Sequence, residues 1–191
     1  QTRRILRADI DAPTNRQDMI SATRKQALVM LDNVNNQHMN RDEVLRLWDD
    51  LGDEYFLREI AEDILWHTEA ILKHPPIGRA SNADSPPLVV LREHRELALD
   101  AGQGVVYTQD QVYLFAVTMA VFDQIKLEVL DARIITATRD FALDSYVLLD
   151  RSGTLLVDSA SQQELKQRLI DAFKTPTSPK LTNKRIPRQL K

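Results

Sequence analysis

The chain has 191 residues, of which 43% are hydrophobic and 28% are charged, as in an average globular protein of one or two domains. Its net charge of −3 argues against nucleic-acid binding by the whole chain, and the absence of cysteine excludes disulfides, thiolate nucleophiles and cysteine-ligated zinc. No apolar run approaches the ~18 residues of a membrane span, so we expect a cytoplasmic protein without membrane contact.

Residues 1–76 are predicted to form a helical subdomain. The chain begins with Gln1 rather than Met, and we expect a fragment of a longer protein in which residues 1–12 end an upstream helix. Pro13 would break that helix, and Asn15 can cap the next one. Four apolar side chains share a face of this next helix: Ile20, Ala27, Leu31 and Val34.

Two further helical segments have clearer boundaries. Asn40 and Glu43 form a capping-box-like pair at the start of one helix, and Gly52 marks its end. Its apolar residues have helical spacing: Val44, Leu47, Trp48 and Leu51. The third segment begins near Tyr55 and Phe56 and ends before Pro75 and Pro76. Its stripe, which we expect to share a core with the second helix, comprises Ile60, Ile64, Thr68 and Ile71.

Residues 77–87 contain one glycine, two serines and two prolines and have little to bury, so we predict a linker there. Residues 88–175 then alternate β-type and helical runs. The predicted strands are Leu88–Arg92, Val105–Thr108, Val129–Thr138 and Leu143–Asp150, with one helix after Asp110 and another over Gln162–Phe173. From the second strand onward the order is strand–helix–strand–strand–helix, a split βαβ unit of the ferredoxin type. The predicted fold class is therefore α+β, a helical subdomain followed by a ferredoxin-like βαββαβ domain.

The end of this domain differs from a complete four-stranded unit. Its final helix is expected to have Ser161 as N-cap and Glu164 in the first turn. The tail, residues 176–191, contains three prolines, five basic residues and no acidic ones, so it is a poor strand and is interpreted as a basic linker. The domain is therefore predicted to lack its last strand. We expect Leu88–Arg92 to take the open edge beside Val105–Thr108, or two chains to pair there.

The turn between the second strand and its helix is the candidate ligand-binding site. It comprises Thr108, Gln109, Asp110, Gln111, Val112 and Tyr113. Free N–H groups at a helix start can hold a carboxylate group of a ligand. The alternative is that Asp110 merely caps its own helix.

No catalytic or metal site is predicted. The histidines, which have no metal-binding i, i+4 spacing, are His38, His67, His74 and His94. We interpret His67 as a hydrogen-bonded core residue and His74 as a cation at a helix C-terminus. Asp9 and Asp11 form the only Asp-x-Asp pair, but no Gly-Ser turn precedes them, and the chain has no glycine-rich phosphate loop. The basic tail has no aromatic residues for stacking on nucleic acid. An acidic group is interpreted as a solvated helix end: Asp49, Asp50, Asp53 and Glu54.

Several sequence runs are more distinctive together than any one is alone. They are Leu51–Leu57, Trp66–Leu72, Pro87–Glu93, Tyr107–Ala116, Leu130–Ile134, Thr138–Asp140, Ala142–Asp150 and Arg188–Lys191. In this order they resemble the first ACT domain, with the helical region before it, of the bifunctional uridylyltransferase/uridylyl-removing enzymes that modify the PII nitrogen-regulatory protein. The resemblance spans nearly the whole chain.

The resemblance implies a regulatory role. Enzymes of that family contain a nucleotidyltransferase domain, a histidine–aspartate metal hydrolase domain and two ACT domains. Residues 1–76 would be the C-terminal part of the region after the hydrolase domain, and residues 88–175 an ACT-like domain. The implied partners are glutamine at the ACT end, PII through the parent enzyme, the second ACT domain and the catalytic domains. Magnesium and UTP would be needed by the parent, and no cofactor by this segment.

The resemblance also implies a direction of regulation, in which high glutamine favours removal of uridylyl groups and low glutamine favours their addition.

The sequence departs from the family pattern at the candidate ligand-binding turn. ACT domains that bind amino acids often have Asp-x-Pro-Gly-Leu there, whereas Val112 and Tyr113 occupy the proline and glycine positions here. We expect Tyr113 to crowd the turn. The alternative function is a protein-interaction or dimerisation module that binds no small molecule.

Overall fold

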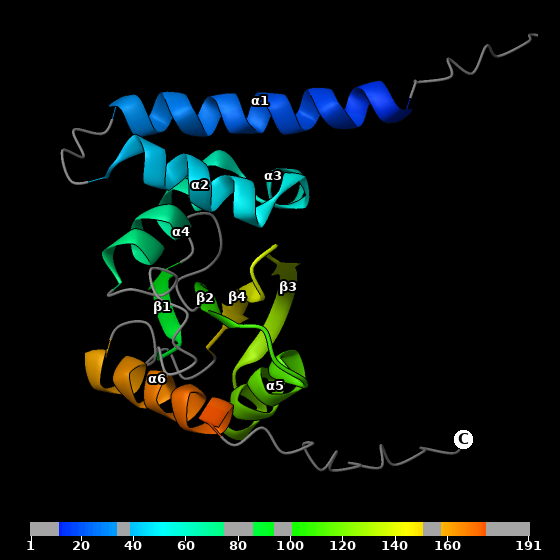
Figure 1. Cartoon of the computed structure of the whole chain (residues 1–191). Helices are drawn as coiled ribbons and strands as arrows, with labels where there is room; N and C mark the ends of the chain where they lie inside the picture. The colour runs from blue at the N-terminus through cyan, green and yellow to red at the C-terminus, as the bar shows by residue number, and fades with distance from the viewer. Residues whose placement is uncertain (1–11, 34–38, 75–85, 94–100, 151–157, 175–191) are drawn as a thin grey trace, which may run out of the picture. The chain divides into compact units, whose positions relative to one another are not determined.

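A computed structural model describes residues 12–33, 39–74, 86–93, 101–150 and 158–174 (Figure 1). Their elements in chain order are α1 (Ala12–Asn33), α2 (Arg41–Leu51), α3 (Asp53–Arg58), α4 (Ala61–Lys73), β1 (Leu88–Glu93), β2 (Ala101–Gln109), α5 (Leu114–Gln124), β3 (Glu128–Thr136), β4 (Phe141–Leu149) and α6 (Ser159–Lys174). This order confirms the predicted α+β class. The chain divides into two compact units, each of which includes part of the sheet.

The first unit comprises residues 1–90, 105–109 and 133–145. Its first helix, α1, begins at Ala12, so Pro13 lies in the first turn of α1, while the upstream helix that Pro13 was predicted to end lies outside the described residues. Proline is tolerated there because the first N–H groups of a helix have no intrahelical acceptor. Asn15 consequently lies inside α1 and does not cap it. Three predicted core residues are buried, namely Ile20, Ala27 and Leu31, whereas residues 1–11 and Val34 lie outside the described residues.

The boundaries of α2 are those that the sequence predicts. The side chain of Asn40 accepts a hydrogen bond of 2.9 Å from the N–H of Asp42, which satisfies one of the free donors at the helix start. At the other end, Gly52 has a φ of 76°, in the region that favours glycine, and its N–H donates to the carbonyl of Trp48.

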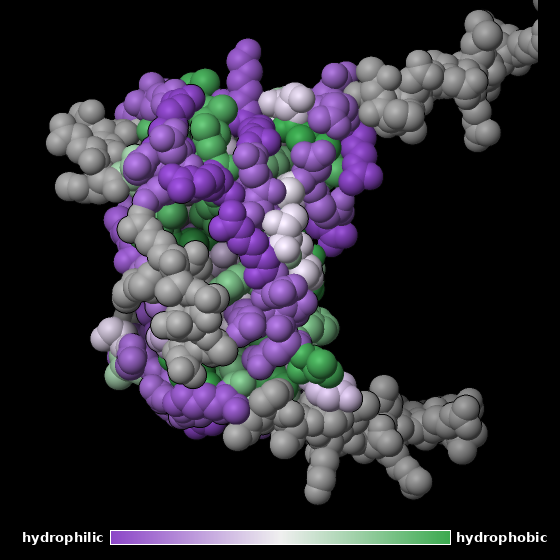
Figure 2. Space-filling model, in the orientation of Figure 1, coloured by the Kyte–Doolittle hydropathy of each residue, from purple (hydrophilic) through white to green (hydrophobic). Residues whose placement is uncertain are grey.

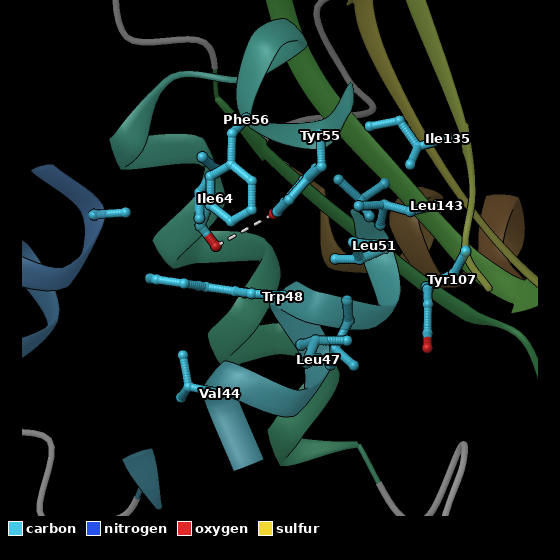
Figure 3. Packing of buried hydrophobic residues seen from close by; sticks show 14 of the residues in the cluster. Val44, Leu47, Trp48, Leu51, Tyr55, Phe56, Ile64, Tyr107, Ile135 and Leu143 are labelled. Carbon is cyan, nitrogen blue, oxygen red and sulfur yellow. Dashed lines mark hydrogen bonds between the residues drawn. The ribbon is translucent and has the colours of Figure 1, made fainter. Parts of the chain in front are cut away.

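The apolar faces of α1–α4 form one core with residues of the sheet (Figure 3). Trp48, Tyr55 and Ile64 are among its fully buried side chains, and Ile135 and Leu143 join them from β3 and β4. The expected shared core of α2 and α4 is therefore confirmed. The members from α2 and α4 are Val44, Leu47, Trp48, Leu51, Ala61, Ile64 and Ile71, and α3 contributes Tyr55 and Phe56.

One position of the predicted stripe was wrong. Ile60 is 57% exposed, because it precedes α4 in an extended conformation and therefore does not follow the helical spacing of Ile64, Thr68 and Ile71. The buried residue at this corner between α3 and α4 is Glu59, with an exposure of 4%.

The strands have the order β1-β2-β4-β3, which places β1 on the edge next to β2. This confirms that Leu88–Arg92 takes the edge that the split βαβ unit leaves open, whereas residues 175–191 lie outside the described part of the chain. β2 begins at Ala101, earlier than predicted, and includes Gly104. A Cβ at Gly104 would lie 3.1 Å from Leu91 Cδ2 and 3.2 Å from Leu148 Cδ1, so glycine makes room there for leucines of both neighbouring strands.

The second unit comprises residues 91–104, 110–132 and 146–191. Its helices α5 and α6 pack against each other, and Phe122 of α5 lies edge-on to Tyr146 of β4 with ring centroids 5.2 Å apart. The predicted N-cap of α6 was wrong. Asp158, not Ser161, accepts hydrogen bonds at the helix start, because α6 begins at Ser159, and Glu164 instead pairs with Arg168 one turn on. The buried face of α6 comprises Leu165, Leu169 and Phe173.

Candidate functional site

The candidate ligand-binding turn connects β2 to α5 by fewer loop residues than predicted. Thr108 and Gln109 belong to β2, and Asp110 to Tyr113 form the connection. Thr108 is buried at 6% exposure, whereas Gln109 and Asp110 are exposed. Side chains of a strand alternate between the faces of the sheet, so Thr108 does not share a face with Gln109.

The first helical turn of α5 is organised by the backbone. Tyr113 occupies the N-cap position with φ 69° and ψ 12°, and its side chain makes no capping hydrogen bond. The carbonyl of Gln111 accepts the N–H of Leu114 at 3.2 Å, and the carbonyl of Tyr113 accepts the N–H of Val117 at 2.8 Å. The alternative in which Asp110 caps α5 was therefore wrong, because Asp110 lies three residues before the N-cap.

Tyr113 occupies a left-handed backbone conformation that costs a residue with a Cβ about 1–2 kcal/mol. The local geometry thus matches what a glycine would adopt without strain. The Tyr113 side chain is 51% exposed. Two neighbouring apolar side chains, Val112 and Phe115, are also exposed, at 70% and 44%. Figure 2 shows hydrophobic atoms at the surface in the region that α5 occupies in Figure 1, within a view that is otherwise mostly hydrophilic.

Two of the four histidines, His67 and His74, lie in the described part of the chain, and each has a position that contributes to the fold. His67 is buried, and its Nδ1 lies 3.1 Å from the hydroxyl of Tyr55, which confirms the interpretation as a hydrogen-bonded core residue. His74 follows the last residue of α4 as its C-cap, at the predicted helix end. Within the described ranges, no group of three or more histidine, aspartate or glutamate side chains lies in an arrangement that could hold a metal ion.

A buried carboxylate that the sequence did not point to lies at the corner between α3 and α4. The side chain of Glu59 is only 1% exposed. It accepts hydrogen bonds from Arg133 Nη1 of β3 at 2.8 Å and from Ser145 Oγ of β4 at 2.5 Å. Burial raises the pKa of Glu59, against the opposing effects of Ser145 and Arg133. Glu59 therefore joins the helices of the first unit to both strands of the β3–β4 hairpin.

A second polar clamp joins α2 to the turn of the same hairpin. The carbonyl of Asp50 accepts the N–H of Thr138 at 2.9 Å, and its carboxylate lies 3.1 Å from Arg139 Nε. The interpretation of the acidic group as a solvated helix end was therefore wrong for Asp50, whose side chain is only 23% exposed. Its neighbours Asp49 and Glu54 form exposed ion pairs with arginines of α1 and α3.

The fold and these contacts define a helical region followed by an ACT-like α+β module. The family described as "Uridylyltransferase GlnD fifth domain" matches residues 15–70. Over all 191 residues the chain is 93% identical to a bifunctional uridylyltransferase/uridylyl-removing enzyme of Psychrobacter cryohalolentis and 78% identical to one of Psychrobacter sp. strain PRwf-1. It is 45% identical to one of Acinetobacter baylyi over a 192-residue alignment. The chain belongs to the family of these enzymes.

The match covers the chain completely but these relatives only in part. The chain spans 21% of the length of each of the two Psychrobacter relatives and 20% of the Acinetobacter relative. No helix in the described part of the chain is long and apolar enough to cross a membrane.

Proposed function

We propose that this chain is the regulatory segment of an enzyme that adds uridylyl groups to the PII nitrogen-regulatory protein and removes them. The observation that carries the proposal is the identity of 93% to 45%, along the whole chain, with enzymes named for both reactions. The segment senses glutamine at its ACT-like part, and its helices convey the bound state to the catalytic domains and the second ACT domain. Magnesium and UTP serve the catalytic domains of the parent enzyme.

The β2–α5 turn supports the glutamine-sensing part of this proposal. An α-amino acid carries a carboxylate, which the N–H groups of the first turn of α5 can bind, and an ammonium group, which needs an anion. Asp110 is exposed beside this turn and supplies that anion. Tyr113 has the positive φ that a glycine would adopt at this turn, and its ring is half exposed.

Calorimetric titration of the chain with L-glutamine tests this assignment. We expect saturable heat with L-glutamine and none with D-glutamine, which presents its ammonium group differently. Asp110→Asn removes a charge-assisted hydrogen bond of about 1.5–3 kcal/mol and is expected to weaken binding roughly 10- to 100-fold. Asp123→Asn, at the exposed far end of α5, is the matched control and is expected to bind as the unmodified chain does.

Two results would contradict glutamine sensing at this turn. One is the absence of heat at millimolar L-glutamine, and the other is equal weakening by Asp110→Asn and Asp123→Asn. In either case the turn is not the receptor.

The exposed apolar side chains favour a second candidate function, a dimerisation module. Val112, Tyr113 and Phe115 are 44–70% exposed over four consecutive positions, and burial of such side chains drives association. Sedimentation equilibrium of the chain and of the Val112→Ser/Phe115→Ser variant distinguishes the two functions. Self-association that the variant loses supports the dimerisation module. A chain that stays monomeric and binds glutamine contradicts it.

A further inference from the structure

Glu59 is a fully enclosed carboxylate of the first unit that bridges the helices and the β3–β4 hairpin. Its two hydrogen-bond donors come from different strands, Arg133 of β3 and Ser145 of β4. Arg133 is 33% exposed on its side chain, so water screens the cation while the carboxylate stays dry. The corner between α3 and α4 is thus tied to the hairpin by one buried carboxylate, in addition to the apolar core that the same elements share.

Other ionisable groups around Glu59 make its charge less favourable. Asp63 in the first turn of α4 is buried at 5% exposure and repels the Glu59 charge. Tyr55 of α3 is completely enclosed, and burial together with the charges of Glu59 and Asp63 raises its pKa far above the ordinary value. Tyr55 is therefore neutral and adds no negative charge to the site. Among the described residues, Arg133 is the cation that acts on Glu59.

The effects of burial and of the hydrogen-bond donors on the pKa of Glu59 determine whether protonation favours or disfavours docking of the corner on the hairpin. Burial raises the pKa of Glu59 more than Ser145 and Arg133 lower it. When the corner leaves the hairpin, Glu59 meets water and regains an ordinary pKa. The docked state consequently binds a proton more tightly than the undocked state does. Docking is strengthened as the pH falls through the range between the two pKa values and is weakened as the pH rises through it.

We propose that Glu59, with Arg133 and Ser145, is a proton-linked latch that closes the α3–α4 corner onto the β3–β4 hairpin when Glu59 is neutral and loosens it when Glu59 is charged. This device goes beyond glutamine sensing and does not depend on it. It gives the segment a second input, since any event that neutralises Glu59 tightens the same contact. Glu59 acts here as a positioning residue.

Hydrogen exchange of the 191-residue chain at several pH values, corrected for intrinsic exchange rates, tests the latch. In the unmodified chain we expect protection of residues 133–145 and 55–64 to rise as the pH is lowered from about 8 to about 5. Glu59→Gln keeps the shape but carries no charge: its amide oxygen can still accept the hydrogen bond from Arg133, while its NH2 group can donate to Ser145 Oγ. Its protection is expected to stay high and independent of pH. Its melting temperature is expected to exceed that of the unmodified chain by a few degrees near pH 8 and to equal it near pH 4.

The matched control is Glu164→Gln, which removes an exposed carboxylate from an ion pair with Arg168 on α6. It is expected to leave the pH dependence of residues 133–145 unchanged. A Glu59→Gln chain that is unfolded, or less protected than the unmodified chain at every pH, would show that the charged ion pair is what closes the contact, and would overturn the proposal. Equal pH dependence in both chains would overturn it as well. Because no glutamine is added, failure here leaves the proposed function standing, and failure of glutamine binding leaves the latch standing.

Discussion

Trp48 is the side chain on which the helical core is expected to depend most. Its ring is fully enclosed, lies edge-on to Phe56 with centroids 5.6 Å apart, and donates a 2.8 Å hydrogen bond from Nε1 to Thr68 Oγ1. Replacing a buried tryptophan by alanine costs about 3–5 kcal/mol of unfolding free energy. For a chain of this length that corresponds to a fall in melting temperature of roughly 6–20 °C.

The hydrogen bond can be separated from the packing by milder variants. Thr68→Val keeps the volume but leaves the buried indole N–H without its acceptor, at a cost of about 1–3 kcal/mol. Trp48→Phe keeps a ring but removes the donor, while the Thr68 hydroxyl still donates to the carbonyl of Ile64 at 2.6 Å. The double variant is expected to cost less than the sum of the two single changes by about 1 kcal/mol, because neither buried partner is then left unmatched.

Urea and thermal unfolding followed by circular dichroism at 222 nm measure these differences without relying on tryptophan emission. Trp66→Ala is the matched control, because Trp66 lies on α4 but is only partly buried. It is expected to cost clearly less than Trp48→Ala. A loss below about 1 kcal/mol for Trp48→Ala, or equal losses for the two tryptophans, would refute this description of the core.

Four further predictions concern other sites. Tyr113→Gly is expected to stabilise the chain by about 0.5–1 kcal/mol in urea unfolding because it relieves the positive φ, whereas Tyr113→Ala brings no gain. Asp158→Ala removes the α6 cap and is expected to cost about 1 kcal/mol, seen as faster hydrogen exchange in the first turn of α6, and unchanged exchange would contradict the cap. Burial, with a smaller effect of the Asp50 charge, raises the pKa of Tyr107 to about 12, so unfolding free energy is expected to fall between about pH 10 and 12, less steeply in Tyr107→Phe. The isolated chain is expected neither to add uridylyl groups to PII nor to remove them, and turnover with labelled UTP or labelled PII would contradict this.

The elements that could be predicted are those with local determinants. The start and end of α2 follow from Asn40 and Gly52, whose side chain and conformation act within one helical turn. The place of β1 was also predictable, because the split βαβ unit needs a fourth strand and the proline-containing tail is unsuited to supply it. In both cases the deciding interaction depends on a short stretch of sequence or on topology alone.

The missed features depend on partners that are distant in sequence. Glu59 is separated from Arg133 by 74 residues and from Ser145 by 86, so hydropathy alone assigns burial to Ile60 and exposure to Glu59, the reverse of the structure. The residue type of Tyr113 does not indicate its conformation, because a left-handed tyrosine looks like any other tyrosine in a sequence; only its place at the glycine position of the ACT turn pointed to a positive φ. For α6 the sequence contains two good N-cap residues three positions apart, Asp158 and Ser161, and the earlier one is the cap.

The two polar clamps on the β3–β4 hairpin differ in what they contribute. Arg139 is 66% exposed, so its ion pair with Asp50 is screened by water and is worth at most about 1 kcal/mol. The Glu59 carboxylate is dry, and loss of a partner from such a buried pair costs about 3–5 kcal/mol unless the remaining group changes its charge. Protonation of Glu59 is the change that avoids this cost. The buried clamp, unlike the exposed one, therefore ties the position of the helices to a charge that can be altered, which is the property that a relay between a sensing module and a catalytic domain requires.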